Sequence, residues 1–440
     1  MKRYLVLFIL SFFWLFVQSQ DLEYAKSIID KLCAEDMHGR GYINAGDKNA
    51  AYLIENEFKS NNLLPYNIIE GSVGSQAGKR IRNFVQEFQI KVNTFPTNVL
   101  LRIDGIDLKA GVDFTLKPSS GPIADKELDL YYLSKKNIKD EDAYDAFSSE
   151  DYTAVCVVID IDEFAKEKDN EYYQLVLKND IRADAIMLLV SSEVTWGVSQ
   201  TFEKFPTYIV KKDKLPKKAA MIEVLHETKY YYSYKTQNVI GKIEGKTHKD
   251  KYILVGAHYD HLGRLGNNTF YPGANDNASG VAMMLDIAKH YSDVFNQPEY
   301  TMIFVGFGAE EAGLLGSKYF VENSPVPLKD IRMMINLDMM SSGEGGLMVV
   351  NTKANSSDFN KIKQINTKKQ YVEPLMSRPV AAISDHHFFH AAGVPALFFY
   401  LMGEKDKEYY YHNPFDVPSN VSMMGYNASF KLLTEFIEKL

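Results

Sequence analysis

The C-terminal half of the chain alternates short apolar runs with longer amphipathic stretches. Apolar runs of strand length lie at 252–257, 300–307, 331–337, 346–350 and 394–400. Apolar residues at helical spacing predict helices at 279–293, 310–323, 355–368 and 422–440. Strands that are apolar on both faces and alternate with helices are typical of a parallel sheet covered on both sides. We therefore predict an α/β fold with a mixed, mainly parallel sheet between layers of helices.

Two more helices are predicted near the start of the chain. Apolar residues recur at helical spacing over 22–32 and again over 50–58, and the second helix should end near 61–65. The stretch 83–99 has the alternation of an extended strand. We assign 20–95 as an N-terminal helical part of the same domain as 231–440.

The stretch that lies between these two parts has a different pattern of apolar and polar residues. Short apolar runs at 128–133, 152–161, 183–192 and 206–210 are separated by charged turns that contain Gly and Pro. His226 is the only histidine of this region, and no acidic pair lies at metal-ligand spacing. We predict an inserted β-rich accessory domain over 96–230 rather than a second catalytic site.

The first twenty residues resemble an export signal. They read MKRYLVLFILSFFWLFVQSQ, a basic start followed by an apolar run from Tyr4 to Val17 and then the small Ser19. The alternative, a membrane anchor, is disfavoured because the apolar run is short for a spanning helix. We expect residues 1–19 to be a signal peptide and the mature protein to be exported to the periplasm or the medium, with no membrane contact after cleavage.

Composition narrows the classes of partner. The chain has 440 residues, enough for two compact units, and a net charge of −8 from 49 basic and 57 acidic side chains. A dispersed, mildly acidic charge disfavours nucleic acid as a partner. Cys33 and Cys156 are too few for a disulfide scaffold, and the sequence leaves open whether they pair. The oligomeric state is also left open.

Residues that bind metals follow the predicted strands of the C-terminal domain. His258 follows the first strand, the pair Glu310–Glu311 the second and Asp338 the third, while His412 lies in a loop after the strand 394–400. Asp276 lies in a Gly-rich loop before a helix. In open α/β sheets the functional groups gather at the carboxyl ends of the strands. Any one of these residues alone could cap a turn or a helix, but their recurrence at one edge predicts a metal site.

The types of ligand indicate the metal. Two imidazoles and several carboxylates without a thiolate suit Zn²⁺, with Mn²⁺ or Co²⁺ as alternatives. A single tetrahedral zinc ion with a site for water takes three protein ligands, so five ligands favour two ions that share a carboxylate. Asp276, on a glycine-flanked loop, is the candidate for the shared ligand. We predict two Zn²⁺ ions per chain.

Two acidic residues have catalytic assignments. Adjacent side chains at a helix start point in different directions, so we assign Glu311 as a metal ligand and Glu310 as a general base. Asp260, two residues after His258, is predicted to accept the second ring N–H of that histidine. His386, with its neighbour Asp385, is the candidate for a contact to one of the metal-binding side chains or to the substrate. His261, His290, His387 and His390 are assigned to structural roles.

Six motifs together resemble a known family. They are GAHYDHLG (256–263), GANDNASGVA (273–282), FGAEEAGLLGS (307–317), NLDM (336–339), SDHHFF (384–389) and YHNPFDV (411–417). In this order they are similar to the co-catalytic di-zinc aminopeptidases of the aminopeptidase Y and bacterial leucyl aminopeptidase type, peptidase family M28. The resemblance covers about 236–440 and the two N-terminal helices. The segment before Thr236 looks like the protease-associated domain that many members carry as an insertion.

The resemblance implies how the ligands divide. His258, Asp276 and Asp338 would hold one zinc ion, and Asp276, Glu311 and His412 the other, with Glu310 as the base. The implied function is an exported aminopeptidase that acts on peptide substrates.

Three other functions remain open at this point. A glutaminyl cyclase resembles the same fold with a single zinc ion, but its members usually carry a Trp shortly after the Glu pair, and here Trp occurs only at 14 and 196. A carboxypeptidase on the same scaffold is a second alternative. A non-catalytic binding protein is a third, although it predicts the loss of a ligand or of the base, and none is missing.

Overall fold

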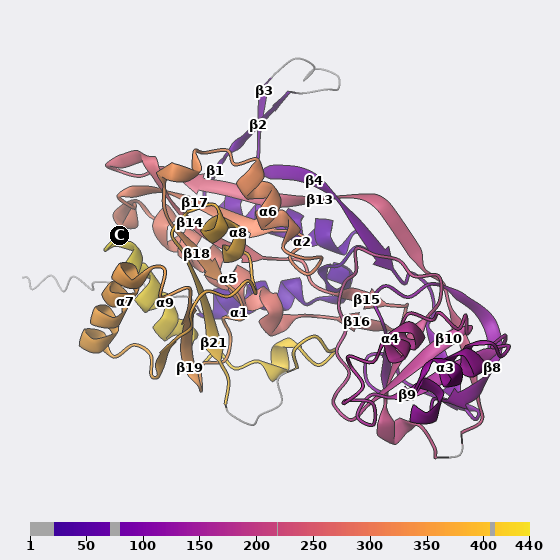
Figure 1. Cartoon of the computed structure of the whole chain (residues 1–440). Helices are drawn as coiled ribbons and strands as arrows, with labels where there is room; N and C mark the ends of the chain where they lie inside the picture. Colours follow the sequence, from indigo (N-terminus) through magenta and orange to yellow (C-terminus); the bar gives the residue numbers. More distant parts are fainter. Residues whose placement is uncertain (1–21, 71–79, 218, 405–409) are drawn as a thin grey trace, which may run out of the picture.

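The computed structural model describes residues 22–440 except 71–79, 218 and 405–409. Within this part of the chain, two large sheets form two units that lie side by side (Figure 1). The predicted signal peptide, residues 1–19, lies outside the described residues. Among the residues described, no helix has the length and apolar character needed to cross a membrane.

The larger sheet is mixed, with parallel strands at its centre. Its strands are β1 (Leu64–Pro65), β4 (Val85–Thr94), β13 (Lys229–Ile243), β14 (His248–His258), β17 (Tyr300–Phe307), β18 (Ile331–Leu337), β19 (Gly346–Val350), β20 (Leu375–Ser377) and β21 (Ala396–Met402). Their order is β1-β13-β17-β14-β18-β21-β19-β20, with β4 also paired to β13. The neighbours β17, β14, β18 and β21 run parallel, whereas β13 and β19 flank them antiparallel. This confirms the predicted α/β class with a mixed sheet.

Helices cover both faces of the larger sheet. One face carries α1 (Leu22–Leu32), α2 (Gly46–Ser60), α5 (Gly280–Ser292), α7 (Ser356–Lys369) and α9 (Tyr426–Ile437). The other face carries α6 (Leu315–Glu322) and α8 (His386–Ala391), whose Phe320 and Phe389 pack on Phe307 of the sheet. Most of α5 is buried because this helix is apolar around nearly its whole circumference. Each fully buried large apolar side chain contributes about 1.5–3 kcal/mol to this core.

Two helix boundaries differ from the prediction. The helix predicted at 310–323 begins only at Leu315, because Ala309 and Leu314 have left-handed backbones (φ 58° and 59°) that interrupt a helix. Glu310 and Glu311 therefore lie in a turn between β17 and α6 and not at a helix start. The helix predicted at 422–440 spans only Tyr426–Ile437.

The smaller sheet is built from residues between Leu100 and His226. Its strands are β5 (Leu100–Ile103), β6 (Ile106–Asp107), β7 (Phe114–Leu116), β8 (Ile123–Tyr132), β9 (Val155–Asp160), β10 (Ala185–Val190), β11 (Thr207–Lys211) and β12 (Met221–His226), in the order β6-β5-β12-β8-β9-β10-β11-β7. The helices α3 (Glu141–Ser148) and α4 (Glu171–Leu177) share an apolar cluster with one face of this sheet.

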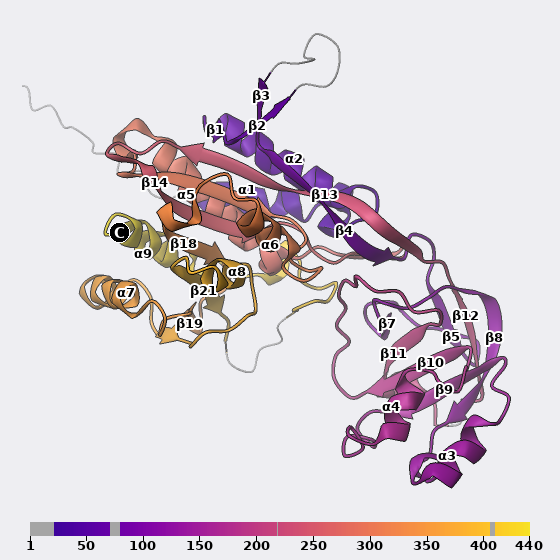
Figure 2. The ribbon, with the colours of Figure 1, turned by 45° about the horizontal axis from the view of Figure 1, so that its top comes forward.

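The other face of the smaller sheet packs against the larger unit. The long strands β4 and β13 reach from the larger sheet towards it (Figure 2). A hairpin of β15 (Gly263–Leu265) and β16 (Thr269–Tyr271) contributes Leu265 and Tyr271 to the apolar cluster of the smaller sheet. A further hairpin pairs β2 (Asn67–Glu70) with β3 (Arg80–Asn83). Cys33 and Cys156 are buried free thiols in separate cores, so they do not pair.

Candidate metal centre

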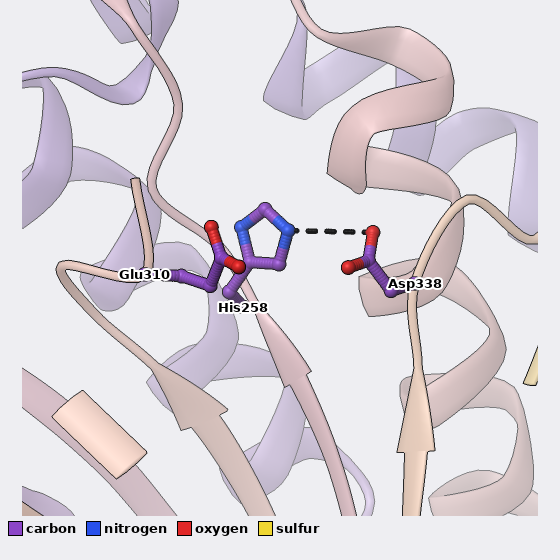
Figure 3. A group of neighbouring side chains, drawn as sticks. All are labelled: His258, Glu310 and Asp338. Atoms are coloured by element: carbon purple, nitrogen blue, oxygen red, sulfur yellow. Dashed lines mark ion pairs between the residues drawn. The ribbon is translucent and has the colours of Figure 1, made fainter. Parts of the chain in front are cut away.

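The predicted ligands meet at the carboxyl edge of the parallel strands. His258 is the last residue of β14, and Asp338 directly follows β18. Figure 3 shows the His258 ring between the carboxylates of Glu310 and Asp338, with an ion pair to Asp338. Asp276 lies in the irregular turn Ala274–Ser279 before α5, and the peptide bond after it is cis.

Donor atoms around His258 have the spacing of zinc ligands. Its Nε2 atom lies 3.3 Å from Oδ1 of Asp276 and 3.4 Å from Oδ1 of Asp338. Tetrahedral ligands with bonds of 2.0–2.1 Å to zinc are about 3.3 Å from one another. Each of the two carboxylate oxygens therefore lies at the distance from Nε2 that two ligands of one zinc ion have.

A second set of donor atoms shares Asp276. The His412 Nε2 atom lies 3.2 Å from Oδ2 of Asp276 and 3.3 Å from Oε2 of Glu311. The two oxygens of Asp276 thus face one histidine each, as a bridging carboxylate does. Imidazole nitrogens and carboxylate oxygens without a thiolate are donors that suit Zn²⁺.

Glu310 lies beside the donor atoms of the first set. Ligand atoms of His258, Glu310 and Asp338 all lie within 4.8 Å of one another. The carboxylate of Glu310 is not one of the atoms at tetrahedral spacing, so it is free to face a substrate or a water molecule.

The tautomers of both histidines are set by backbone carbonyls. Nδ1 of His258 lies 3.1 Å from the carbonyl oxygen of Asp260, and Nδ1 of His412 lies 3.0 Å from that of Trp196. A nitrogen that faces a carbonyl must carry the proton, which leaves the Nε2 lone pair of each ring for a metal. The prediction that the Asp260 carboxylate accepts the His258 N–H is wrong: the nearest carboxylate oxygen is 4.0 Å away.

The carboxylate of Asp260 holds the glutamate turn instead. It accepts the backbone N–H groups of Glu310 at 3.0 Å and Glu311 at 3.3 Å, and the hydroxyl of Tyr42 at 3.0 Å. All of this takes place in the interior, because Asp260 is fully buried. Asp260 therefore positions the two glutamates through their main chain.

The loop that carries Asp276 is held from both ends of the chain. Arg40 donates to the carbonyl oxygens of Gly273 at 2.8 Å and Asp276 at 3.3 Å. Asp416 accepts the backbone N–H groups of Asn275 at 2.8 Å and Asp276 at 3.0 Å. Neither residue is predicted from the sequence, because a buried side chain that binds main-chain groups follows no spacing rule.

Comparison with known proteins assigns the family. Residues 238–437 match the sequence model of Peptidase family M28. Aminopeptidase YwaD of Bacillus subtilis is 28% identical over 364 residues, which cover 79% of this chain and 75% of YwaD. Residues 238–437 belong to peptidase family M28. A probable leucine aminopeptidase of Arthroderma otae is 28% identical over 220 residues, 48% of this chain and 60% of that protein.

The fold of this chain is shared with solved aminopeptidase structures over nearly its whole length. The structure of BSAP, a zinc aminopeptidase from Bacillus subtilis, matches 96% of this chain and 95% of that chain with a TM-score of 0.68 and 22% identity. The aminopeptidase from Aneurinibacillus sp. strain AM-1 matches 96% and 94% with a TM-score of 0.60 and 19% identity.

The candidate metal centre concentrates negative charge in the interior. Burial lowers the pKa of His412, but the carboxylates of Glu311 and Asp276 outweigh it and raise that pKa to about 11. Burial raises the pKa of Glu311, yet the charge of His412 holds it at about 2. Carboxylates that stay charged when buried need cations close by. The centre is thus suited to positive ions.

Glu310 has the opposite shift. Burial raises its pKa well above the usual range, and the carboxylates of Glu311 and Asp385 add to the effect against the charge of His258. Once ionised, a carboxylate with a raised pKa is a stronger proton acceptor, which suits a general base.

Two other histidines differ from their assignments. His261, assigned to structure, contacts Glu311 with Nδ1 at 2.8 Å from Oε1, and its place three residues after His258 in one motif was the signal for it. In the described residues it is Ser384, and not His386, that donates to Asp338, at 2.7 Å. His386 instead stacks on Phe398 with ring centroids 5.2 Å apart. Asp385 is buried and acts on Glu310 through its charge.

A cavity of about 230 Å³ opens over the centre. His258, Asp276, Glu310, Asp338 and His412 line its floor. Its walls are mostly apolar or aromatic and comprise Met339, Arg378, Ile383, Phe398, Tyr400 and Tyr411. A side chain of moderate size fits this space next to the reacting groups.

Proposed function

We propose that this protein is a zinc aminopeptidase that holds two zinc ions per chain and hydrolyses the N-terminal peptide bond of peptides. The observation that carries the proposal is the shared carboxylate: the two oxygens of Asp276 lie 3.2–3.3 Å from the Nε2 atoms of His412 and His258. Asp338 completes one set of donors and Glu311 the other. The membership in family M28 supports the same function.

The chain divides the chemistry among its residues. Two bound zinc ions would polarise the scissile carbonyl and lower the pKa of water. The carboxylate of Glu310 takes a proton from the water that attacks the carbonyl carbon. As the C–N bond breaks, Glu310 passes this proton to the leaving amine. The Asp260 carboxylate holds Glu310 in place through its backbone N–H.

The function is tested with the purified chain and a panel of free and N-blocked peptides, with zinc quantified in the same sample. Release of N-terminal amino acids from free peptides only, abolished by a chelator and restored by Zn²⁺, is the expected result. Cyclisation of N-terminal Gln without hydrolysis would show that the protein is a glutaminyl cyclase and not an aminopeptidase. Release from the C-terminus would replace it with a carboxypeptidase, and no turnover of any peptide would refute an enzyme.

We further propose that the protein is exported and that residues 96–230 form a protease-associated-like domain. The support for export is the basic and then apolar pattern of residues 1–19. Sequencing the N-terminus of the protein from the medium and from cell fractions tests it. A mature chain that begins near Gln20 outside the cytoplasm is expected, and an intact Met1 in the cytoplasm would contradict it.

A further inference from the structure

His412 lies in a turn, outside the helices and strands of the described residues. It lies between β21 and α9, and its backbone is left-handed with φ 57°, which is uncommon for a residue with a side chain. A ligand placed in this way needs support from elsewhere in the fold. The support comes from the smaller unit.

Trp196 of the smaller unit contacts His412 twice. The backbone N–H of Trp196 donates to the carbonyl oxygen of His412 at 3.0 Å, and Nδ1 of His412 donates to the carbonyl oxygen of Trp196, also at 3.0 Å. The first bond holds the main chain of the ligand and the second sets its ring. The tautomer of His412 thus depends on a residue some 200 positions earlier in the chain.

Packing of the Trp196 indole holds the backbone of this residue in place. The indole is buried, with its ring centroid 5.0 Å from that of Tyr271 and 6.0 Å from that of Phe95. Tyr271 is the last residue of β16 and stands just ahead of the loop that carries Asp276. The same side chain therefore links the supports of two ligands.

Four residues further on, Gln200 contacts the glutamate turn. Its Nε2 atom donates to the carbonyl oxygen of Ala312 at 2.6 Å, directly after Glu311. The carbonyl oxygen of Gln200 accepts the Tyr230 hydroxyl at 2.7 Å, and that of Ser199 accepts the backbone N–H of Asn93 at 2.9 Å. The segment 196–200 is thereby tied to β13 and β4, and through Gln200 to the turn that carries Glu310 and Glu311.

We propose that Trp196 and Gln200 are positioning residues of the metal centre, and that the second zinc ion, held by His412 and Glu311, binds tightly only while the segment 196–200 is in place. The smaller unit is then a structural component of the active site and not an appendage to it. This inference rests on the proposed two-zinc function. Partners that orient the ligands of a metal typically change its affinity about 10- to 100-fold when removed.

The test measures zinc, not only turnover. We expect Trp196→Ala to keep one ion and to bind the other about 10- to 100-fold more weakly, as measured by zinc content after gel filtration and by competition with a chelator. Trp196→Phe, which keeps an aromatic ring against Tyr271, should restore most of the affinity. Gln200→Ala should weaken the same ion with less disturbance of the core, and it decides the question if Trp196→Ala does not fold.

The matched control is Phe202→Ala. Phe202 lies two residues after this segment, is 40% exposed and contacts only the Tyr230 ring among the aromatic groups described, at 5.7 Å. This variant should hold both ions as the unaltered chain does. Two ions bound with unaltered affinity by folded Trp196→Ala and Gln200→Ala would overturn the inference. Fewer than two ions in the unaltered chain would instead overturn the two-zinc function on which it rests.

Discussion

The carboxylate of Asp260 accepts the backbone N–H of Glu310 at 3.0 Å and thereby joins the end of β14 to the turn that follows β17. Since the same carboxylate also accepts the N–H of Glu311, one buried acid sets the main chain of both the proposed base and a proposed ligand. The Tyr42 hydroxyl is its third donor, although burial outweighs these hydrogen bonds and raises the pKa of Asp260 to about 7. Its contribution to function is geometric.

Replacement of Asp260 tests this geometry. Asp260→Asn keeps one acceptor oxygen but turns an amide NH₂ towards N–H donors, so the turn should shift. We expect kcat to fall about 10- to 100-fold with little change in the zinc held by His258. Steady-state kinetics and zinc content measure both quantities. Tyr42→Phe, which removes only one donor, should have a smaller effect, and an equal effect of the two variants would contradict the role of the turn.

Replacement of Glu310 by Gln tests the base. The amide cannot accept a proton, whereas the two sets of zinc donors do not include this side chain. We expect zinc content to stay at that of the unaltered chain while kcat falls about 100- to 10,000-fold. Full activity in the zinc-loaded Glu310→Gln variant would move the base to another residue.

The shared carboxylate predicts unequal effects of two acidic substitutions. Asp276→Ala removes an oxygen from both sets of donors, whereas Asp338→Ala removes one from the His258 set only. Asp276→Ala should therefore lose both ions on dialysis against a weak chelator, and Asp338→Ala should keep one. Metal analysis of the dialysed proteins measures the difference. Equal zinc content in both variants would argue against a bridging Asp276.

Arg40 is predicted to be a major source of stability. Its guanidinium is buried and donates to five backbone carbonyl oxygens, those of Leu32, Tyr259, Pro272, Gly273 and Asp276. Lysine has no planar fork, so Arg40→Lys leaves several carbonyls unpaired and should lower the free energy of unfolding by about 3 kcal/mol or more. Urea unfolding of the metal-free protein measures it. The control is Arg102→Lys at a surface position, where Arg102 pairs with Asp107 and Glu223, and this change should have a much smaller effect.

Asp47, which is not a metal ligand, should make the stability of the protein depend on pH. Burial raises its pKa to about 6, although hydrogen bonds from Tyr234 and Thr236 oppose the shift. Because the folded pKa exceeds the unfolded value of about 3.9, this contribution is complete below pH 4 and is lost as the pH rises through 6. A shift of roughly two units corresponds to about 3 kcal/mol.

The Asp47→Asn variant isolates this contribution. Urea unfolding of the metal-free protein at pH 4 and at pH 7 gives the change in free energy for each form. The unaltered chain should lose about 2 kcal/mol more than Asp47→Asn between these two pH values, since part of the contribution is already lost at pH 4. An equal loss in both forms would show that Asp47 does not titrate in this range.

The regular part of the fold was predictable because its signal is local. The run at 300–307 matches β17 at both ends, since its apolar residues are buried on both faces of a central strand. The start of α6 was not predictable. It depends on left-handed backbones at Ala309 and Leu314, and neither residue type signals that conformation in a sequence.

The metal site was predictable as a set of positions but not as a set of contacts. His258, Glu311 and Asp338 follow strands, and parallel strands bring their ends together whatever the side chains are. By contrast, the partner of the second His258 nitrogen is a carbonyl, and that of His412 is the main chain of Trp196. Every residue has a carbonyl, so no residue type marks these partners.

Arg40 is synthesised long before most of the carbonyl groups to which it donates. This guanidinium leaves the ribosome 219 residues before Tyr259 and 236 before Asp276, the most distant of its acceptors. Asp416, which holds the same loop, is made 140 residues later still. The smaller sheet, with all its strands between these points, is complete while Arg40 still awaits its partners. The centre is therefore complete only late in synthesis. A chain that ended before His412 would hold the donors of the His258 set but would lack His412 and the Asp416 carboxylate that holds the Asp276 loop.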